Sequence, residues 1–130
     1  MTFSIRVAGL LVAAGIAGGA VAQAQSLDVP LATRDMTQML TAIGHSSYAD
    51  FVAPATTVFK AHVDPKKFPV QAAEINAKIP LGQPFSVKYL TTQRVGPTVG
   101  YIFEVTLHDG DQVLTDLTLN NGKVASFHLL

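Results

Sequence analysis

The chain has 130 residues, enough for one small domain, and its nine Lys and Arg balance nine Asp and Glu. Because the sequence has no basic stripe to hold phosphates, this balance argues against nucleic-acid binding. The absence of Cys excludes a disulfide framework, a thiolate zinc site and a Cys nucleophile. The apolar fraction of 48% is high, and much of the excess lies in the first 24 residues.

Those 24 residues have the three parts of a secretory signal peptide. Arg6 is the only charged residue among them, and Val7–Val21 contains no polar side chain. Ala22-Gln23-Ala24 then forms an A-x-A cleavage pattern. The alternative is a retained anchor, but a spanning helix needs about 20 apolar residues and this run is shorter. We therefore expect residues 1–24 to be a cleaved signal peptide. Residues 25–130 would then be one exported domain, periplasmic or secreted, with no membrane span.

The first helix of this domain is expected after a short lead-in that ends at Leu31. Thr33 can cap the helix, Asp35 would lie in its first turn, and Gly44 is a natural stop. An apolar face with the i, i+3, i+4, i+7 spacing is formed by Met36, Met39, Leu40 and Ile43. This spacing predicts an amphipathic helix.

Two further helices are expected before residue 80. Ser46 or Ser47 can cap a short helix that carries Tyr48, Phe51 and Val52. Pro65 or Pro69 can open another helix that runs to about Lys78, with Ala72, Ala73, Ile75 and Ile79 on one side. Residues 56–63 are ambiguous between helix and strand.

After Pro84 the pattern changes to alternation of apolar and polar residues. Four strands are expected, at Phe85–Val95, Val99–His108, Gln112–Asn120 and Lys123–Leu130. The sequence therefore predicts an α+β fold, with about three N-terminal helices packed on a curved four-stranded antiparallel meander sheet.

The turns decide which strand residues face the core, because a slip of one residue moves every side chain to the other face. A three-residue loop at His108–Gly110 pairs Tyr101 with Leu117 and Phe103 with Thr115. A three-residue loop at Asn120–Gly122 would likewise pair Leu117 with Ala125 and Thr115 with Phe127. These pairings place the apolar residues on one inner face.

Three segments, Tyr48–Phe51, Phe103–Gly110 and Leu117–Val124, carry a resemblance to a known family. Together with the order of elements, they resemble the nuclear-transport-factor-2-like (cystatin-like) superfamily, and within it small exported bacterial proteins of unknown function. The resemblance implies a cone between the helices and the sheet. In catalytic members, Asp, His or Tyr side chains point into this cone. The superfamily includes isomerases, cyclases and dehydratases as well as non-catalytic binding modules, so the fold alone does not assign a function.

Few polar residues are expected at this cone. Tyr101 and Thr115 are the only polar residues on the inner face of the last three strands, beside Phe103, while Tyr48 and Asp50 can reach the mouth from the second helix. These five residues are the candidates for ligand binding, and no residue is assigned as catalytic. For Tyr101 a core position with a satisfied hydroxyl is the simpler interpretation, and for Asp50 a cap or a solvent-facing position.

The outer face of the sheet would carry Asp116, Ser126 and His128. A Ser, a His and an Asp together suggest nucleophilic catalysis, but an open sheet face offers neither oxyanion donors nor exclusion of water. A solvated polar face or a dimer surface is the simpler interpretation. The four His lack the local spacings of a metal motif, so we expect no metal and no cofactor.

Three functional hypotheses follow from the sequence. The first is an exported non-catalytic module that binds a protein or a small apolar ligand. The second is a small isomerase- or cyclase-like enzyme that uses Tyr48, Asp50 or Tyr101. The third is a structural homodimer formed through the sheet, where Ile102, Leu114 and Val124 interrupt a polar face.

Overall fold

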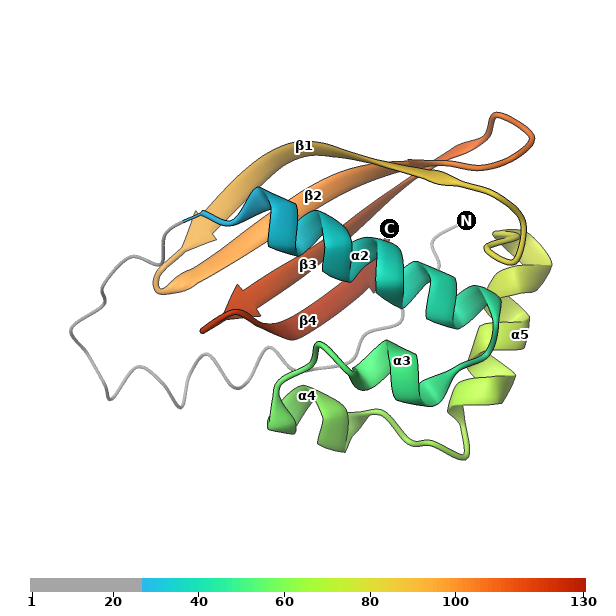
Figure 1. Ribbon diagram of the computed structural model, residues 1–130, viewed down its shortest axis with the longest axis horizontal. Helices are drawn as coiled ribbons and strands as arrows, with labels where there is room; N and C mark the ends of the chain where they lie inside the picture. Colours follow the sequence, from blue (N-terminus) through green and yellow to red (C-terminus); the bar gives the residue numbers. More distant parts are fainter. Residues whose placement is uncertain (1–26) are drawn as a thin grey trace.

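The computed structural model describes residues 27–130, so the predicted signal peptide lies outside the described residues. Within this part, four helices precede a four-stranded antiparallel sheet of order β1-β2-β3-β4, which confirms the predicted α+β class. The elements are α2 (Val29–Gly44), α3 (Tyr48–Val52), α4 (Thr57–His62), α5 (Phe68–Lys78), β1 (Ser86–Val95), β2 (Thr98–Thr106), β3 (Gln112–Asn120) and β4 (Lys123–Leu129). α2 crosses one face of the curved sheet, and α3 and α4 lie near β4 (Figure 1).

The long helix α2 begins earlier than the sequence predicted. Its cap is Asp28, whose carboxylate accepts a 3.0 Å hydrogen bond from the amide of Leu31, and a Pro occupies the first turn. Thr33 is not the cap, because its hydroxyl donates to the carbonyl of Val29 inside the helix. The predicted end at Gly44 and the predicted apolar face are both confirmed, since Met36, Met39, Leu40 and Ile43 are all fully buried.

The short helix α3 is capped by Ser47, one of the two caps that the sequence predicted. Helix α5 has Pro69, one of the two predicted prolines, in its first turn. The ambiguous segment forms the additional helix α4, because the hydroxyl of Thr56 accepts a hydrogen bond from the amide of Phe59. The side chain of Ala73, expected on the buried side of α5, is exposed. The fold therefore has one more helix than predicted.

The β2–β3 hairpin has the predicted register. Tyr101 pairs with Leu117 and Phe103 with Thr115, and Gly110 adopts a φ of +92° in the three-residue loop. The amide of Leu107 donates a hydrogen bond to the carbonyl of Asp111 and so closes this loop. Alternation then places the side chains of one face against the helices and leaves those of the other face outside.

The predicted register of the β3–β4 hairpin is wrong. Leu117 pairs with Phe127 rather than Ala125, and Thr115 with Leu129 rather than Phe127. The turn has two residues, Asn121 and Gly122, both with positive φ, which matches the twist of a two-residue hairpin. A bulge beside Thr118 and Leu119 then shifts the rest of β4.

This bulge turns Val124 into the core, although Val124 was expected on the outer face. The amide of Val124 donates to the carbonyl of Pro54, and its carbonyl accepts from the amide of Thr56, both at 2.8 Å. The chain before α4 therefore covers the start of the edge strand β4. No helix between residues 27 and 130 has the length and apolarity needed to cross a bilayer.

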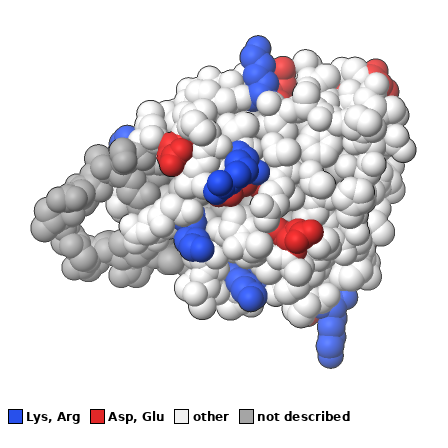
Figure 2. All heavy atoms as spheres, viewed as in Figure 1, with Lys and Arg blue, Asp and Glu red and all other residues white. Residues whose placement is uncertain are grey.

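Charged side chains on the face shown in Figure 2 are scattered, with Lys and Arg interspersed among Asp and Glu over a largely uncharged surface. A nucleic-acid site requires basic side chains gathered on one face. The visible face of the described domain has no such arrangement.

Candidate functional site

The space between the sheet and the helices is filled by apolar side chains. The largest fully buried ones come from both layers and are Tyr101, Phe103, Phe127, Phe51, Phe59, Phe68, Met36 and Met39. The ring of Phe51 lies 5.0 Å from that of Phe68 and 5.4 Å from that of Phe127, measured between centroids. In the described domain these rings fill the space between the sheet and the helices.

The three inner-face candidates are part of this core. Tyr101 is 1% exposed, and its hydroxyl accepts a 2.9 Å hydrogen bond from the amide of Asp28. Phe103 packs edge-on against Tyr89. Thr115 is fully buried, and its hydroxyl has no hydrogen-bond partner among the described residues. Tyr101 and Phe103 thus stabilise the interior.

Tyr48 and Asp50 lie on α3 and do not enter the interior. Asp50 is exposed, and its backbone is held by Ser47, which caps its amide, and by Gln38, whose side-chain amide donates to its carbonyl. Tyr48 is half-buried with its ring edge-on to Phe68. The structure therefore does not bring Tyr48, Asp50 and Tyr101 together as an acid–base group.

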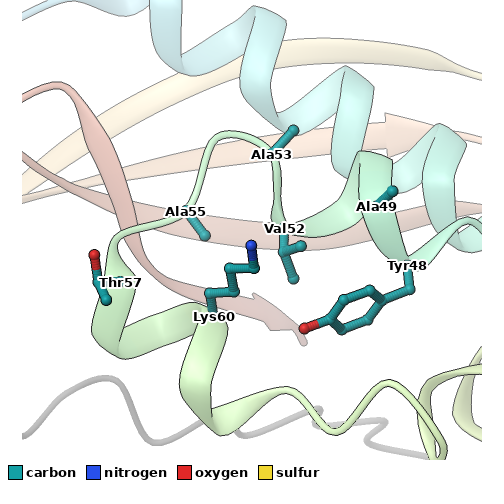
Figure 3. Close-up of a pocket in the computed structure, with 7 residues that line it drawn as sticks. All are labelled: Tyr48, Ala49, Val52, Ala53, Ala55, Thr57 and Lys60. Carbon is teal, nitrogen blue, oxygen red and sulfur yellow. The ribbon is translucent and has the colours of Figure 1, made fainter.

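Tyr48 instead lines an open pocket between α3 and α4, which we call the α3–α4 groove. Its volume is about 420 Å³, and Val52 and Ala55 form part of its apolar wall. The ring of Tyr48 and the side chain of Lys60 reach into it from the two helices, with Val52 between them (Figure 3). Sequence reasoning identified Tyr48 but not Lys60, because α4 itself was not predicted.

A second pocket, which we call the Asp35 pocket, has a volume of about 260 Å³. It lies between α2, the chain after α3 and the β3–β4 turn. α2 contributes Arg34, Asp35 and Gln38 to its wall, the chain after α3 contributes Pro54, and the start of β4 contributes Lys123. This pocket places a carboxyl group and two cationic side chains together.

Asp35, like Lys60, is a functional candidate that the sequence did not reveal. It is 3% exposed and lies in the second turn of α2 rather than in the first. Burial raises the pKa of this carboxyl above its ordinary value, while Arg34 and Lys123 oppose the shift and Asp28 adds slightly to it. The sequence does contain a sign of this burial in the spacing of Asp35, which follows Ala32 by three residues and precedes Met39 by four. This spacing places Asp35 on the buried face of α2.

On the outer face, Asp116 and His128 lie directly opposite each other on β3 and β4. Oδ1 of Asp116 lies 2.7 Å from Nδ1 of His128, and both side chains are partly exposed. The hydroxyl of Ser126 bonds that of Thr118 at 2.6 Å, so its hydrogen bond does not go to the His. These contacts form two cross-strand pairs, not a catalytic triad.

Between residues 27 and 130 no three His, Asp or Glu side chains are gathered closely enough to hold a metal ion. The sequence matches no protein-family model, and no curated protein matches it. Among solved structures, the chain is similar to an uncharacterized cystatin-fold protein from Novosphingobium aromaticivorans. The similarity covers 75% of this chain and 96% of that protein, at 15% identity and a TM-score of 0.38. At this level it carries no argument about function, and the α+β class rests on the elements and register described above.

Proposed function

We propose that this protein is an exported, non-catalytic binding module with a fold of the nuclear-transport-factor-2-like (cystatin-like) type. The order of helices followed by an antiparallel meander agrees with that resemblance. The observation that carries the proposal is the filled interior, where Tyr101, Phe103 and Phe127 take the space in which a related enzyme would hold substrate. General acid–base catalysis needs a positioned group within hydrogen-bond reach of a bound substrate. Asp50 is exposed on α3, so it does not supply that group in the interior.

Ligand binding is then assigned to the α3–α4 groove. Its wall is apolar at Val52, Ala53 and Ala55, and Lys60 adds a cation for which no hydrogen bond or ion pair is found among the described residues. A small molecule with an apolar body and one acidic group complements this arrangement. The body would lie on the apolar wall, and the acidic group would bind Lys60 and the hydroxyl of Tyr48.

Titration of the ¹⁵N-labelled protein with hexanoate tests this assignment. Amide shifts are expected to concentrate in α3 and α4, and the uncharged analogue 1-hexanol is expected to bind more weakly. Lys60→Met keeps the apolar stem and removes the charge, so it should weaken hexanoate binding. Lys66→Met removes a charge outside the groove and should not. Equal binding of hexanoate to both variants would exclude the groove as an acid-binding site.

Export has a separate test. Cleavage after Ala24 predicts that the exported protein begins at Gln25. N-terminal sequencing of protein recovered from outside the cytoplasm should find this residue, whereas a chain that still begins near Met1 would contradict cleavage.

A homodimer through the outer sheet face is a second candidate. Leu114 is 43% exposed on this face, next to half-buried Ile102, in an otherwise polar surface. Sedimentation of the protein and of a Leu114→Lys variant distinguishes a monomer from a homodimer. A dimer formed through the sheet should dissociate in the variant, and a wild-type monomer at high concentration would exclude it.

A further inference from the structure

The carboxyl group of Asp35 lacks the hydrogen bonds that a buried carboxylate normally has. Its Oδ2 is fully buried without a hydrogen-bond partner among the described residues. Its Oδ1 lies 3.9 Å from Nε of Arg34, which is too far for a hydrogen bond, and the side chain of Arg34 is 72% exposed. Buried polar groups are almost always satisfied, and an unsatisfied one calls for an explanation. Asp35 also lines a pocket, and 5% of its side chain is exposed, so a ligand with a donor group can approach the carboxyl group at Oδ1, the oxygen that is not fully buried.

The charges around the Asp35 pocket are divided between its walls. The carboxyl group belongs to α2, and the ammonium group of Lys123 belongs to the start of β4. Arg34 adds a second cation beside Asp35. The wall formed by Ala53 and Pro54 has no charged side chain. A ligand that carries a cationic donor and an anionic group close together matches this arrangement, whereas a simple cation would meet Arg34 and Lys123 as like charges.

The pocket walls are held by backbone contacts. Two hydrogen bonds of 2.8 Å join Val124, directly after Lys123, to Pro54 and Thr56. Gln38 donates to the carbonyl of Asp50 and so ties α2 to α3. These contacts fix the backbone of the pocket walls before any ligand arrives, which lowers the entropic cost of binding.

We propose that the Asp35 pocket binds a free α-amino acid, with the ligand's ammonium group on Asp35 and its carboxylate on Lys123 and Arg34. This site is separate from the α3–α4 groove and does not depend on it. The ligand's ammonium donates a charge-assisted hydrogen bond to a carboxylate that has none. The volume of about 260 Å³ is suited to a small molecule rather than to a peptide segment.

The proposed interaction requires Asp35 to be ionised, so affinity should depend on pH. Asp28 and Arg34 on α2 and Lys123 on β4 are the charged groups that act on Asp35. Because burial raises the pKa of Asp35, protonation should weaken amino-acid binding at a higher pH than for an exposed Asp. Affinity should therefore rise with pH as Asp35 loses its proton.

The experiment is a titration of the ¹⁵N-labelled protein with L-alanine, compared with propanoate and ethylammonium. Propanoate lacks the ammonium group and ethylammonium lacks the carboxylate, so each should bind weaker than L-alanine by about tenfold or more. The amide shifts should concentrate at Ala53, Gly122 and Lys123. Binding of propanoate as tight as that of L-alanine would overturn the role of Asp35.

Two pairs of variants complete the test. Asp35→Asn and Lys123→Met should each weaken L-alanine binding by about tenfold or more. Because Asp35→Asn has no titrating carboxyl at this position, its remaining affinity for L-alanine should not depend on the protonation of residue 35. The matched controls Asp111→Asn and Lys66→Met change the same charges at exposed positions outside the pocket and should bind as the wild type does. If Asp35→Asn does not fold, Lys123→Met decides the question, because Lys123 is exposed. Unchanged affinity in a folded Lys123→Met or Asp35→Asn variant would overturn the proposal, as would the absence of any shift with L-alanine.

Discussion

The backbone amide of Asp28 donates a 2.9 Å hydrogen bond to the hydroxyl of Tyr101, joining the start of α2 to the middle of the sheet across 73 positions of the chain. Asp28 also caps α2 through its carboxylate, so one residue begins the helix and fixes it on the sheet. The phenol of Tyr101 thus has a structural role.

Removing this hydroxyl should therefore affect stability. Tyr101→Phe is expected to lower the free energy of unfolding by about 1 kcal/mol, the net value of one hydrogen bond. Urea unfolding followed by circular dichroism measures the change. Tyr48→Phe is the matched control, because no hydrogen bond of the Tyr48 hydroxyl is found among the described residues, and it should change stability little. Equal effects of the two variants would contradict the role of the Asp28–Tyr101 bond.

The aromatic core makes a second prediction. Phe103 and Phe127 are both 0% exposed, so Phe103→Ala and Phe127→Ala should each cost about 3–5 kcal/mol through lost burial and the cavity left behind. Urea unfolding gives these changes in the free energy of unfolding from the shift of the midpoint, provided that the dependence on denaturant concentration keeps the same slope. Leu114→Ala on the outer face should cost little, since Leu114 is exposed. A cost for Leu114→Ala as large as that for Phe103→Ala would show that the faces of the sheet are assigned wrongly.

Gly44 should not tolerate a side chain. The reason is a close approach of the backbone near Leu81, and not only the position of Gly44 at the end of α2. A Cβ at this position would collide with the backbone carbonyl of Leu81. Asn76 holds the two segments together, because its side-chain amide donates to the carbonyl of Ile43 and its side-chain oxygen accepts from the amide of Leu81. Gly44→Ala is therefore expected to destabilise the fold by about 3 kcal/mol or more, measured as a loss of thermal and urea stability.

Gly96→Asn is the control for this prediction. Gly96 has a φ of +59°, which Asn tolerates, and nothing lies within 4 Å of an added Cβ. Its stability should change by less than about 1 kcal/mol. A harmless Gly44→Ala would mean that α2 and Leu81 are less close in solution.

Asp35 predicts a specific dependence of stability on pH. Burial raises its pKa in the folded state, so between the unfolded and folded pKa values the folded protein binds more protons. The contribution of Asp35 to stability is therefore present at low pH and is lost as the pH rises through the folded pKa. Asp35→Asn lacks this titration, so its free energy of unfolding should increase relative to the wild type as the pH rises. Urea unfolding at a series of pH values checks the sign, and a difference that falls with rising pH would contradict burial of the carboxyl.

Local patterns were sufficient for much of this fold. The apolar spacing of α2 predicted its buried face, because a helix places residues three and four apart on one side. The β2–β3 register followed from alternation and from Gly110, since a left-handed residue in a three-residue loop sets the pairing by itself. The same alternation placed Tyr101 and Phe103 in the core rather than at a site.

Other features depended on contacts between distant segments. The β3–β4 register depends on a bulge that turns Val124 inward, where its backbone forms hydrogen bonds with Pro54 and Thr56. No local pattern in β4 encodes those partners.

The burial of Asp35 could not be predicted from the sequence either, because a carboxylate near a helix start is ordinarily a solvated residue that interacts favourably with the helix dipole. Its burial depends on the chain at Pro54 and on the start of β4 at Lys123, which pack over one side of α2. The sequence by itself therefore determined the described elements other than α4, and the faces that α2, β2 and β3 present to the core, since these follow from backbone periodicity. Only the tertiary structure decided which polar groups are enclosed, because burial depends on segments that are far apart in the chain.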